Sequence, residues 1–152
     1  MKFVKLLIAA VALFTAAACE EEIPEKKLEK LDNIELTDWY CTVEKSEGVY
    51  IYYTLSFGAD GQGTLTGYDA KEGGNVESIE TFTYTHTRNN NDIAVTLLFT
   101  DGDTYAGYVI PKGAITVDYK DVFVLQLFKV DEDGMPIEDM YGKYDTMMFW
   151  KE

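Results

Sequence analysis

Residues 49–64 read VYIYYTLSFGADGQGT, and this stretch decides the fold. In its first nine residues the odd positions carry Val, Ile, Tyr, Leu and Phe, whereas the even positions carry Tyr, Tyr, Thr and Ser. A period of two places one set of side chains on each face of a β-strand, and β-branched and aromatic residues suit such a surface. Asp60-Gly61 then supplies a turn. The stretch therefore predicts a half-buried strand that ends in a tight turn.

The same period recurs along the chain, in residues 81–85, 93–100 and 115–119. Turn signals separate the runs at Asp60-Gly61, Gly73-Gly74, Asn89–Asp92, Asp101-Gly102, Pro111–Gly113, Lys120-Asp121 and Asp133-Gly134. Short strands at regular spacing with no helical segment between them predict an all-β protein of about eight or nine strands.

Short connections favour an antiparallel up-and-down β-barrel, because each strand then pairs with its neighbour in sequence and closure removes exposed edges. A Greek-key sandwich needs longer crossovers, which are scarce here. The one long connection, residues 131–142, precedes the last strand and is long enough to bring that strand against the first.

The N-terminus has the pattern of an export signal. Lys2 and Lys5 precede thirteen apolar or small residues, 6–18, and Cys19 follows. This run is too short to span a bilayer comfortably, and it ends in residues that a signal peptidase accepts. Residues 1–18 are therefore predicted to be a signal peptide. Cleavage as an ordinary A-x-A site remains the alternative to lipid modification, and both routes cut the same bond.

Ala16-Ala17-Ala18-Cys19 resembles the lipobox of bacterial lipoproteins, although Leu is usual where Ala16 stands. The resemblance implies that Cys19 is acylated and that the mature chain is anchored to a membrane through its acyl chains without spanning it. The acidic run 20–22 resembles the signal that exports lipoproteins of Bacteroidetes to the outer face of the outer membrane. The expected location is the cell envelope, at the outer membrane and on the cell surface.

Residues 19–36 are rich in Glu and Lys and are predicted to be a solvated acidic tether. Leu28, Leu31 and Ile34 lie three residues apart, which allows one or two turns of helix within it. The barrel domain is expected to comprise residues 37–152.

Composition excludes several functions. The chain of 152 residues has 13 basic and 27 acidic residues, a net charge of −14, so nucleic acid is not an expected partner. Zinc needs three or four His or Cys ligands, and the mature domain offers only His86 and Cys41. If Cys19 is acylated, Cys41 has no intramolecular partner and is expected to be a small buried residue. No metal or cofactor is therefore expected.

Catalytic patterns are also missing. The sequence has no G-x-S-x-G motif, and no Gly-rich turn leads into a helix that would bind phosphate. The loop Asp131–Gly134 places its Gly too early for an EF-hand. A carboxylate pair for glycoside cleavage stays open, because 27 acidic residues always offer pairs. The protein is expected not to be an enzyme, and no catalytic residue is predicted.

Residues 37–130 resemble lipocalin-like lipoproteins common in Bacteroidetes. The resemblance rests on Trp39 in the first strand and on the F-x-x-D-G-x-G hairpin of residues 57–63. Thr37 stands where the Gly of the lipocalin G-x-W motif would be. The resemblance implies a barrel of about eight strands, with Trp39 as a plug across its closed end and a mouth that holds a small hydrophobic ligand.

Aromatic residues provide the candidate ligand site. Strand parity places Tyr53 and Leu55 on the apolar face of their strand and Tyr84 on the face of Phe82. The predicted ligand-binding residues, all turned inward toward one end of the barrel, are Tyr53, Leu55, Tyr84, Tyr105 and Trp150. Two functions follow. One is a barrel that binds a small apolar or amphipathic ligand, and the other is a filled barrel that binds a protein or glycan as an interaction module, with the protein partner unknown. An interior void of about 300 Å³ or more separates them.

Overall fold

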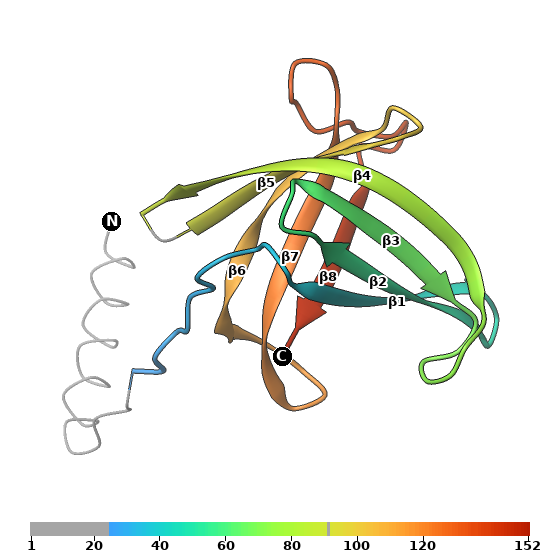
Figure 1. Cartoon of the computed structure of the whole chain (residues 1–152), viewed down its shortest axis with the longest axis horizontal. Helices are drawn as coiled ribbons and strands as arrows, with labels where there is room; N and C mark the ends of the chain where they lie inside the picture. The colour runs from blue at the N-terminus through green and yellow to red at the C-terminus, as the bar shows by residue number, and fades with distance from the viewer. Residues whose placement is uncertain (1–24, 91) are drawn as a thin grey trace, which may run out of the picture.

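The computed structural model describes residues 25–90 and 92–152 and is all-β in these residues. Eight antiparallel strands follow one another along the chain (Figure 1). They are β1 (Asp38–Ser46), β2 (Val49–Phe57), β3 (Gln62–Tyr68), β4 (Val76–Asn89), β5 (Asp92–Phe99), β6 (Thr104–Val117), β7 (Lys120–Val130) and β8 (Thr146–Lys151). No helix among the described residues is long and apolar enough to cross a membrane.

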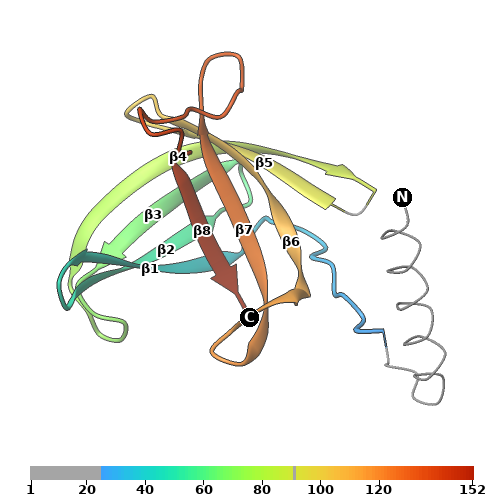
Figure 2. The same cartoon turned by 180° about the vertical axis from the view of Figure 1, so that it is seen from behind.

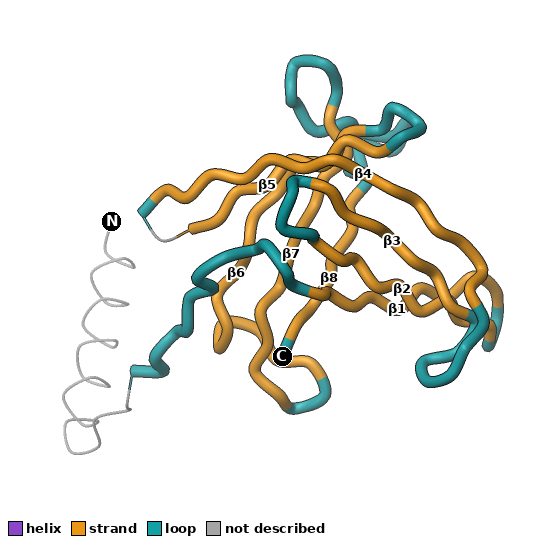
Figure 3. Tube along the Cα trace, in the orientation of Figure 1, coloured by secondary structure: helices purple, strands orange, loops and turns teal. Residues whose placement is uncertain are grey.

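Each strand pairs with its neighbours in sequence order, and the sheet closes into a ring from β1 to β8 (Figures 2 and 3). The predicted up-and-down barrel is thereby confirmed. Closure depends on very little pairing, because Tyr40 of β1 and Trp150 of β8 are the one pair of residues in register between these strands.

β6 corrects the predicted break at Pro111–Gly113. The chain continues there as one strand, whose register with β7 shifts between Ile110 and Ile115. Pro has no N–H to donate to a ladder, so an irregularity is the way a strand accommodates it. Gly113 adopts a positive φ of 101°, and Lys112 exchanges two backbone hydrogen bonds of 2.9 Å with Glu29 instead of pairing with β7. Two expected strands therefore form one bent strand.

The turn between β6 and β7 lies earlier than predicted. Asp118 and Tyr119 have φ values of 50° and 65°, whereas Lys120 and Asp121 already belong to β7. Two consecutive residues with positive φ are typical of the type I′ turn, whose twist matches that of the flanking strands. The strand predicted for residues 115–119 accordingly ends at Val117.

The core comes from one face of each strand. Its largest members are Trp39, Phe57, Phe82, Tyr84, Phe99, Phe123 and Phe149, together with Leu55, Leu97, Leu125 and Leu127. The predicted hairpin motif has a packing reason, because the ring of Phe82 lies across Gly63. A Cβ added to Gly63 would fall 2.3 Å from that ring and 2.5 Å from the carbonyl oxygen of Ser56. Only glycine leaves room for both atoms.

The segment before β1 corrects the predicted tether. Ile34 is fully buried and Leu31 packs against the core, so residues 31–36 belong to the barrel unit. The backbone carbonyl of Asp32 accepts a 2.9 Å hydrogen bond from Arg88 of β4. The neighbouring charged residues Lys30 and Asp32 stay exposed, so the segment buries its two apolar side chains without desolvating these charges. Residues 19–24 of the tether, Cys19 and the signal peptide lie outside the described residues.

Trp39 lies where this segment enters β1 and is fully buried. Its indole Nε1 donates a 2.8 Å hydrogen bond to the hydroxyl of Thr37, and that hydroxyl donates to the carbonyl oxygen of Ile34. We call this end of the barrel, which contains Ile34 and Trp39, the closed end.

Candidate functional site

The weak closure between β1 and β8 positions the candidate site. The two strands meet at Tyr40 and Trp150 and diverge on one side of this pair. On that side β1 continues to its hairpin with β2, whereas the residues of β8 before Trp150 lead back to the loop after β7 (Figures 1 and 2). The residues of β1 after Tyr40 remain paired with β2, so only the edge of β1 that faces β8 is unpaired. The divergence leaves a wedge in the wall of the barrel.

A cavity of about 340 Å³ occupies this wedge. Ligand pockets in proteins range from about 300 to 1,000 Å³, so the cavity is at the small end of that range. It is lined by Cys41, Val43, Tyr53, Leu65, Glu80, Phe99, Asp101, Asp103, Tyr105, Thr146, Met147, Met148 and Phe149. We call this the wedge cavity. Its walls therefore come from both diverging strands and from the strands opposite them.

The inner wall of the wedge cavity is aromatic and sulfur-rich. Phe99 and Tyr105 contact each other edge to face, with ring centroids 5.7 Å apart. Met147 and Cys41 pack against the core as partly buried side chains. Burial raises the pKa of the Cys41 thiol, which keeps it protonated at neutral pH. Cys41 therefore lines the cavity as a small, partly buried thiol, and it is less buried than expected from the sequence.

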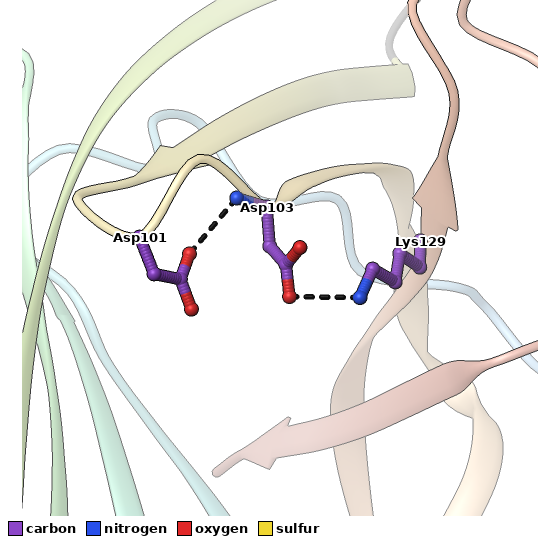
Figure 4. A network of polar contacts seen from close by, with 3 residues as sticks. All are labelled: Asp101, Asp103 and Lys129. Carbon is purple, nitrogen blue, oxygen red and sulfur yellow. Dashed lines mark hydrogen bonds and ion pairs between the residues drawn. The ribbon is translucent and has the colours of Figure 1, made fainter.

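The rim of the wedge cavity is acidic and ordered. In the hairpin between β5 and β6, Asp101 Oδ1 accepts a 2.8 Å hydrogen bond from the backbone N–H of Asp103 (Figure 4). Asp103 Oδ2 accepts a 2.8 Å bond from Lys129 Nζ of β7, which forms an ion pair (Figure 4). Glu80 of β4 adds a third carboxylate. The rim thus presents more negative than positive charge to an entering molecule.

Tyr105 contacts Phe99 of the inner wall and is also influenced by the charges of the rim. Its pKa is raised, first by burial and then by the negative charge of Asp145. Its hydroxyl therefore stays protonated and is available as a hydrogen-bond donor to a bound molecule.

Two of the predicted ligand-binding residues, Tyr53 and Tyr105, line the wedge cavity together. Leu55 and Tyr84 also point inward, but they are core residues and do not line it. Tyr84 is 6 % exposed, and its hydroxyl donates to the carbonyl oxygen of Gly58. The inward parity of these four side chains agrees with the alternation of the sequence, but only two of them reach the same space.

Trp150 requires a correction, because it lies on the outer face of the barrel. Phe149, its neighbour in β8, is buried in the core, and successive residues of a strand point to opposite faces. Trp150 instead contacts the exposed ring of Tyr40, with centroids 5.7 Å apart and planes tilted by 50°. The prediction that Trp150 turns inward is wrong.

Comparison with known proteins adds no relative. No family model, curated protein or solved structure matches the chain. Within residues 25–90 and 92–152, no three His, Cys, Asp or Glu side chains come together as metal ligands.

Sequence reasoning missed two lining residues, Glu80 and Phe149, and a local signal exists only for the first. Glu80 occupies the same face of β4 as Phe82 and Tyr84, so strand parity alone directs it inward near the open edge. Phe149 is the inward partner of Trp150, but four consecutive apolar residues at 147–150 give no alternation from which to choose a face.

Proposed function

We propose that the protein is a non-enzymatic, membrane-anchored lipoprotein of the cell envelope that binds a small apolar or amphipathic molecule in the wedge cavity. The observation that carries the proposal is the combination of an aromatic inner wall, which includes Tyr53, Phe99 and Tyr105, with a polar rim. An apolar pocket with a few polar groups at its mouth is the usual form of a small-molecule site.

The lipid anchor in this proposal rests on Cys19 and on the apolar run before it. Acyl chains provide membrane attachment without a spanning segment. The resemblance to lipocalin-like lipoproteins supports the same function, because it implies a barrel with a hydrophobic ligand at its mouth.

A titration with N-phenylnaphthylamine, an uncharged apolar fluorophore, tests the cavity. Its emission is expected to increase on binding, and Cys41→Phe is expected to abolish the increase because the larger ring fills the wedge cavity. The matched control is Thr85→Phe, which adds the same ring at an exposed position of β4 and is expected to leave binding unchanged. Equal binding by the wild type and Cys41→Phe would exclude the wedge cavity as the site.

The alternative function is an interaction module that binds a protein or glycan on its outside. The observation in its favour is that the interior is filled at the closed end, where the side chains of Ile34 and Trp39 are fully buried. A wild-type protein that fails to bind any apolar probe would favour this alternative.

A further inference from the structure

The outer face of the barrel carries a second, larger depression, of about 840 Å³. Its floor is the outside of β1, β2 and β3, and its far wall is the turn between β3 and β4, residues 70–74. We call it the outer groove. Most of its floor is formed by side chains on the outward face of these strands, and it shares Cys41 and Tyr53 with the wedge cavity.

Cross-strand register gathers aromatic rings in the outer groove. Trp150, Tyr40 and Thr54 form one row across β8, β1 and β2. Thr42, Tyr52 and Tyr68 form the next row, across β1, β2 and β3. All six side chains line the groove. Aromatic rings and hydroxyl groups therefore lie side by side on one surface.

The wall of the outer groove is pre-organised. Asp69 accepts hydrogen bonds from Asn75 through both carboxylate oxygens, at 2.7 Å from the backbone N–H and 3.1 Å from the side-chain amide. Gly74 packs so closely on Ala70 that an added Cβ would lie 2.5 Å from the Ala70 carbonyl oxygen. A rigid turn lowers the conformational entropy that a ligand must remove on binding.

Charges of both signs surround the outer groove. Asp38, Glu72 and Glu152 lie along it together with Lys71 and Lys151. The pKa of the Glu152 carboxyl is lowered mainly by its hydrogen bond and ion pair with Lys120, and Lys71 of the turn adds a smaller contribution. The slight excess of acid disfavours an anionic ligand, and the mixture of donors and acceptors suits a neutral polar one.

The backbone beneath the groove constrains the occupant further. β2 and β3 are paired on both sides there, so a peptide could add only to the edge of β1 that diverges from β8, and over the rest of the groove it would be bound by side chains alone. Thr hydroxyls both donate and accept hydrogen bonds, as sugar hydroxyls do. The face of an aromatic ring is electronegative and attracts the C–H groups on the apolar face of a pyranose.

We propose that the outer groove binds a neutral saccharide, with the apolar face of a sugar ring packed against Tyr40 or Trp150 and its hydroxyl groups bound by Thr42, Thr54 and the charged side chains at the edge.

The test is a titration of the full chain in detergent with uncharged hexasaccharides (maltohexaose, cellohexaose and mannohexaose), followed by calorimetry and Trp fluorescence. Trp39 is fully buried, so a change in emission reports on Trp150, the other Trp of the chain. At least one saccharide is expected to bind, and Tyr40→Ala is expected to weaken it about tenfold.

Tyr108→Ala is the matched control, because Tyr108 is 47 % exposed on β6, compared with 43 % for Tyr40, and lies outside the groove. It is expected to bind as the wild type does. Tyr52→Ala provides a second groove variant that leaves the β1–β8 junction intact. Val43→Phe, at a residue that lines the wedge cavity and not the outer groove, is expected to block the fluorophore and to retain saccharide binding, so failure of the wedge-cavity proposal and failure of this one are distinguishable.

Absence of binding by all three saccharides would overturn the proposal, and so would unchanged affinity in both Tyr40→Ala and Tyr52→Ala. Decaproline serves as the peptide arm. Binding of decaproline but of no saccharide would identify the groove as a peptide site and overturn the saccharide assignment.

Discussion

Trp39 and Thr37 are joined by a 2.8 Å hydrogen bond from the indole Nε1 to the hydroxyl oxygen, and Thr37 in turn donates to the Ile34 carbonyl oxygen. This chain of two bonds connects the segment before the barrel to the largest buried side chain of the core. The position at which the lipocalin motif has Gly therefore holds a residue with its own role, because its hydroxyl satisfies the buried indole N–H.

Trp39→Ala is expected to lower the free energy of unfolding by about 3–5 kcal/mol, the range for deleting a large buried aromatic side chain. Thr37→Val retains the packing but removes the partner of the indole N–H and is expected to cost about 1–3 kcal/mol. Urea denaturation measures both values. A stability equal to that of the wild type in Trp39→Ala would contradict the burial of this residue.

Ile34→Ala tests the correction to the tether. A buried Ile that is truncated to Ala costs about 2–5 kcal/mol, whereas the same change in a solvated linker costs almost nothing. Leu36→Ala is the control, because Leu36 is 78 % exposed only two residues away. Thermal unfolding of the two variants side by side distinguishes a docked segment from a free one.

Tyr84 is expected to be a stability residue and not a ligand residue. Its prediction as a ligand-binding residue implies that Tyr84→Ala weakens binding with little loss of stability, but burial among Phe57 and Phe82 implies a cost of about 3–5 kcal/mol. Tyr84→Phe removes only the hydrogen bond to Gly58 and is expected to cost about 0.5–1.5 kcal/mol. Chemical denaturation that shows no difference between Tyr84→Ala and the wild type would restore the original prediction.

High pH is expected to destabilise the barrel through Tyr105. Its folded-state pKa is raised above the ordinary value of 10.0, first by burial and then by Asp145, so the unfolded state loses its proton first. The stabilisation is fully present below about pH 10 and is lost as the pH rises through the folded-state pKa. Tyr105→Phe is expected to show a smaller fall in Tm between about pH 9 and about pH 11. Tyr119→Phe, at a fully exposed turn residue, is the control and keeps the wild-type slope.

Cys19→Ala is expected to release the protein from membranes, because the acyl chains are the anchor in the proposed function. Fractionation of cells that express the wild type or the variant measures the effect. A variant that stays in the membrane fraction at the wild-type level would contradict the lipoprotein assignment. The soluble variant should retain the wild-type melting temperature, since Cys19 precedes the barrel.

Alternation explains why the fold was predictable and parts of the site were not. The strand of residues 49–57 has one apolar side chain at every second position, so both its existence and its inward face follow from the sequence. Residues 147–150 are all apolar, so nothing local shows that Phe149 turns in and Trp150 turns out. The face of β8 is set by its register with β7, which is a long-range property.

The docked segment was hidden for a similar reason. Leu31 and Ile34 lie among charged residues and have the spacing of a helix, so the local pattern gives no sign of an extended chain. The segment is held beside β6 by the backbone pair between Glu29 and Lys112, whose partners are far apart in sequence. Pro111 lies in the irregularity of β6 that leaves Lys112 free for this pair. From the sequence alone, Pro111 was interpreted only as part of a turn.

The position of the docked segment also determines how the barrel faces its surroundings in the proposed lipoprotein. Residues 29–34 lie against β6, β4 and the closed end, whereas the acidic rim belongs to the β5–β6 hairpin (Figure 1). The six peptide units from Cys19 to Glu25 span at most about 20 Å, so an acylated Cys19 keeps the docked segment close to the bilayer. In this proposed arrangement the tether approaches the barrel on the side of the docked segment, and the rim of the wedge cavity lies on the β5–β6 hairpin away from it, so a ligand from solution can reach the cavity.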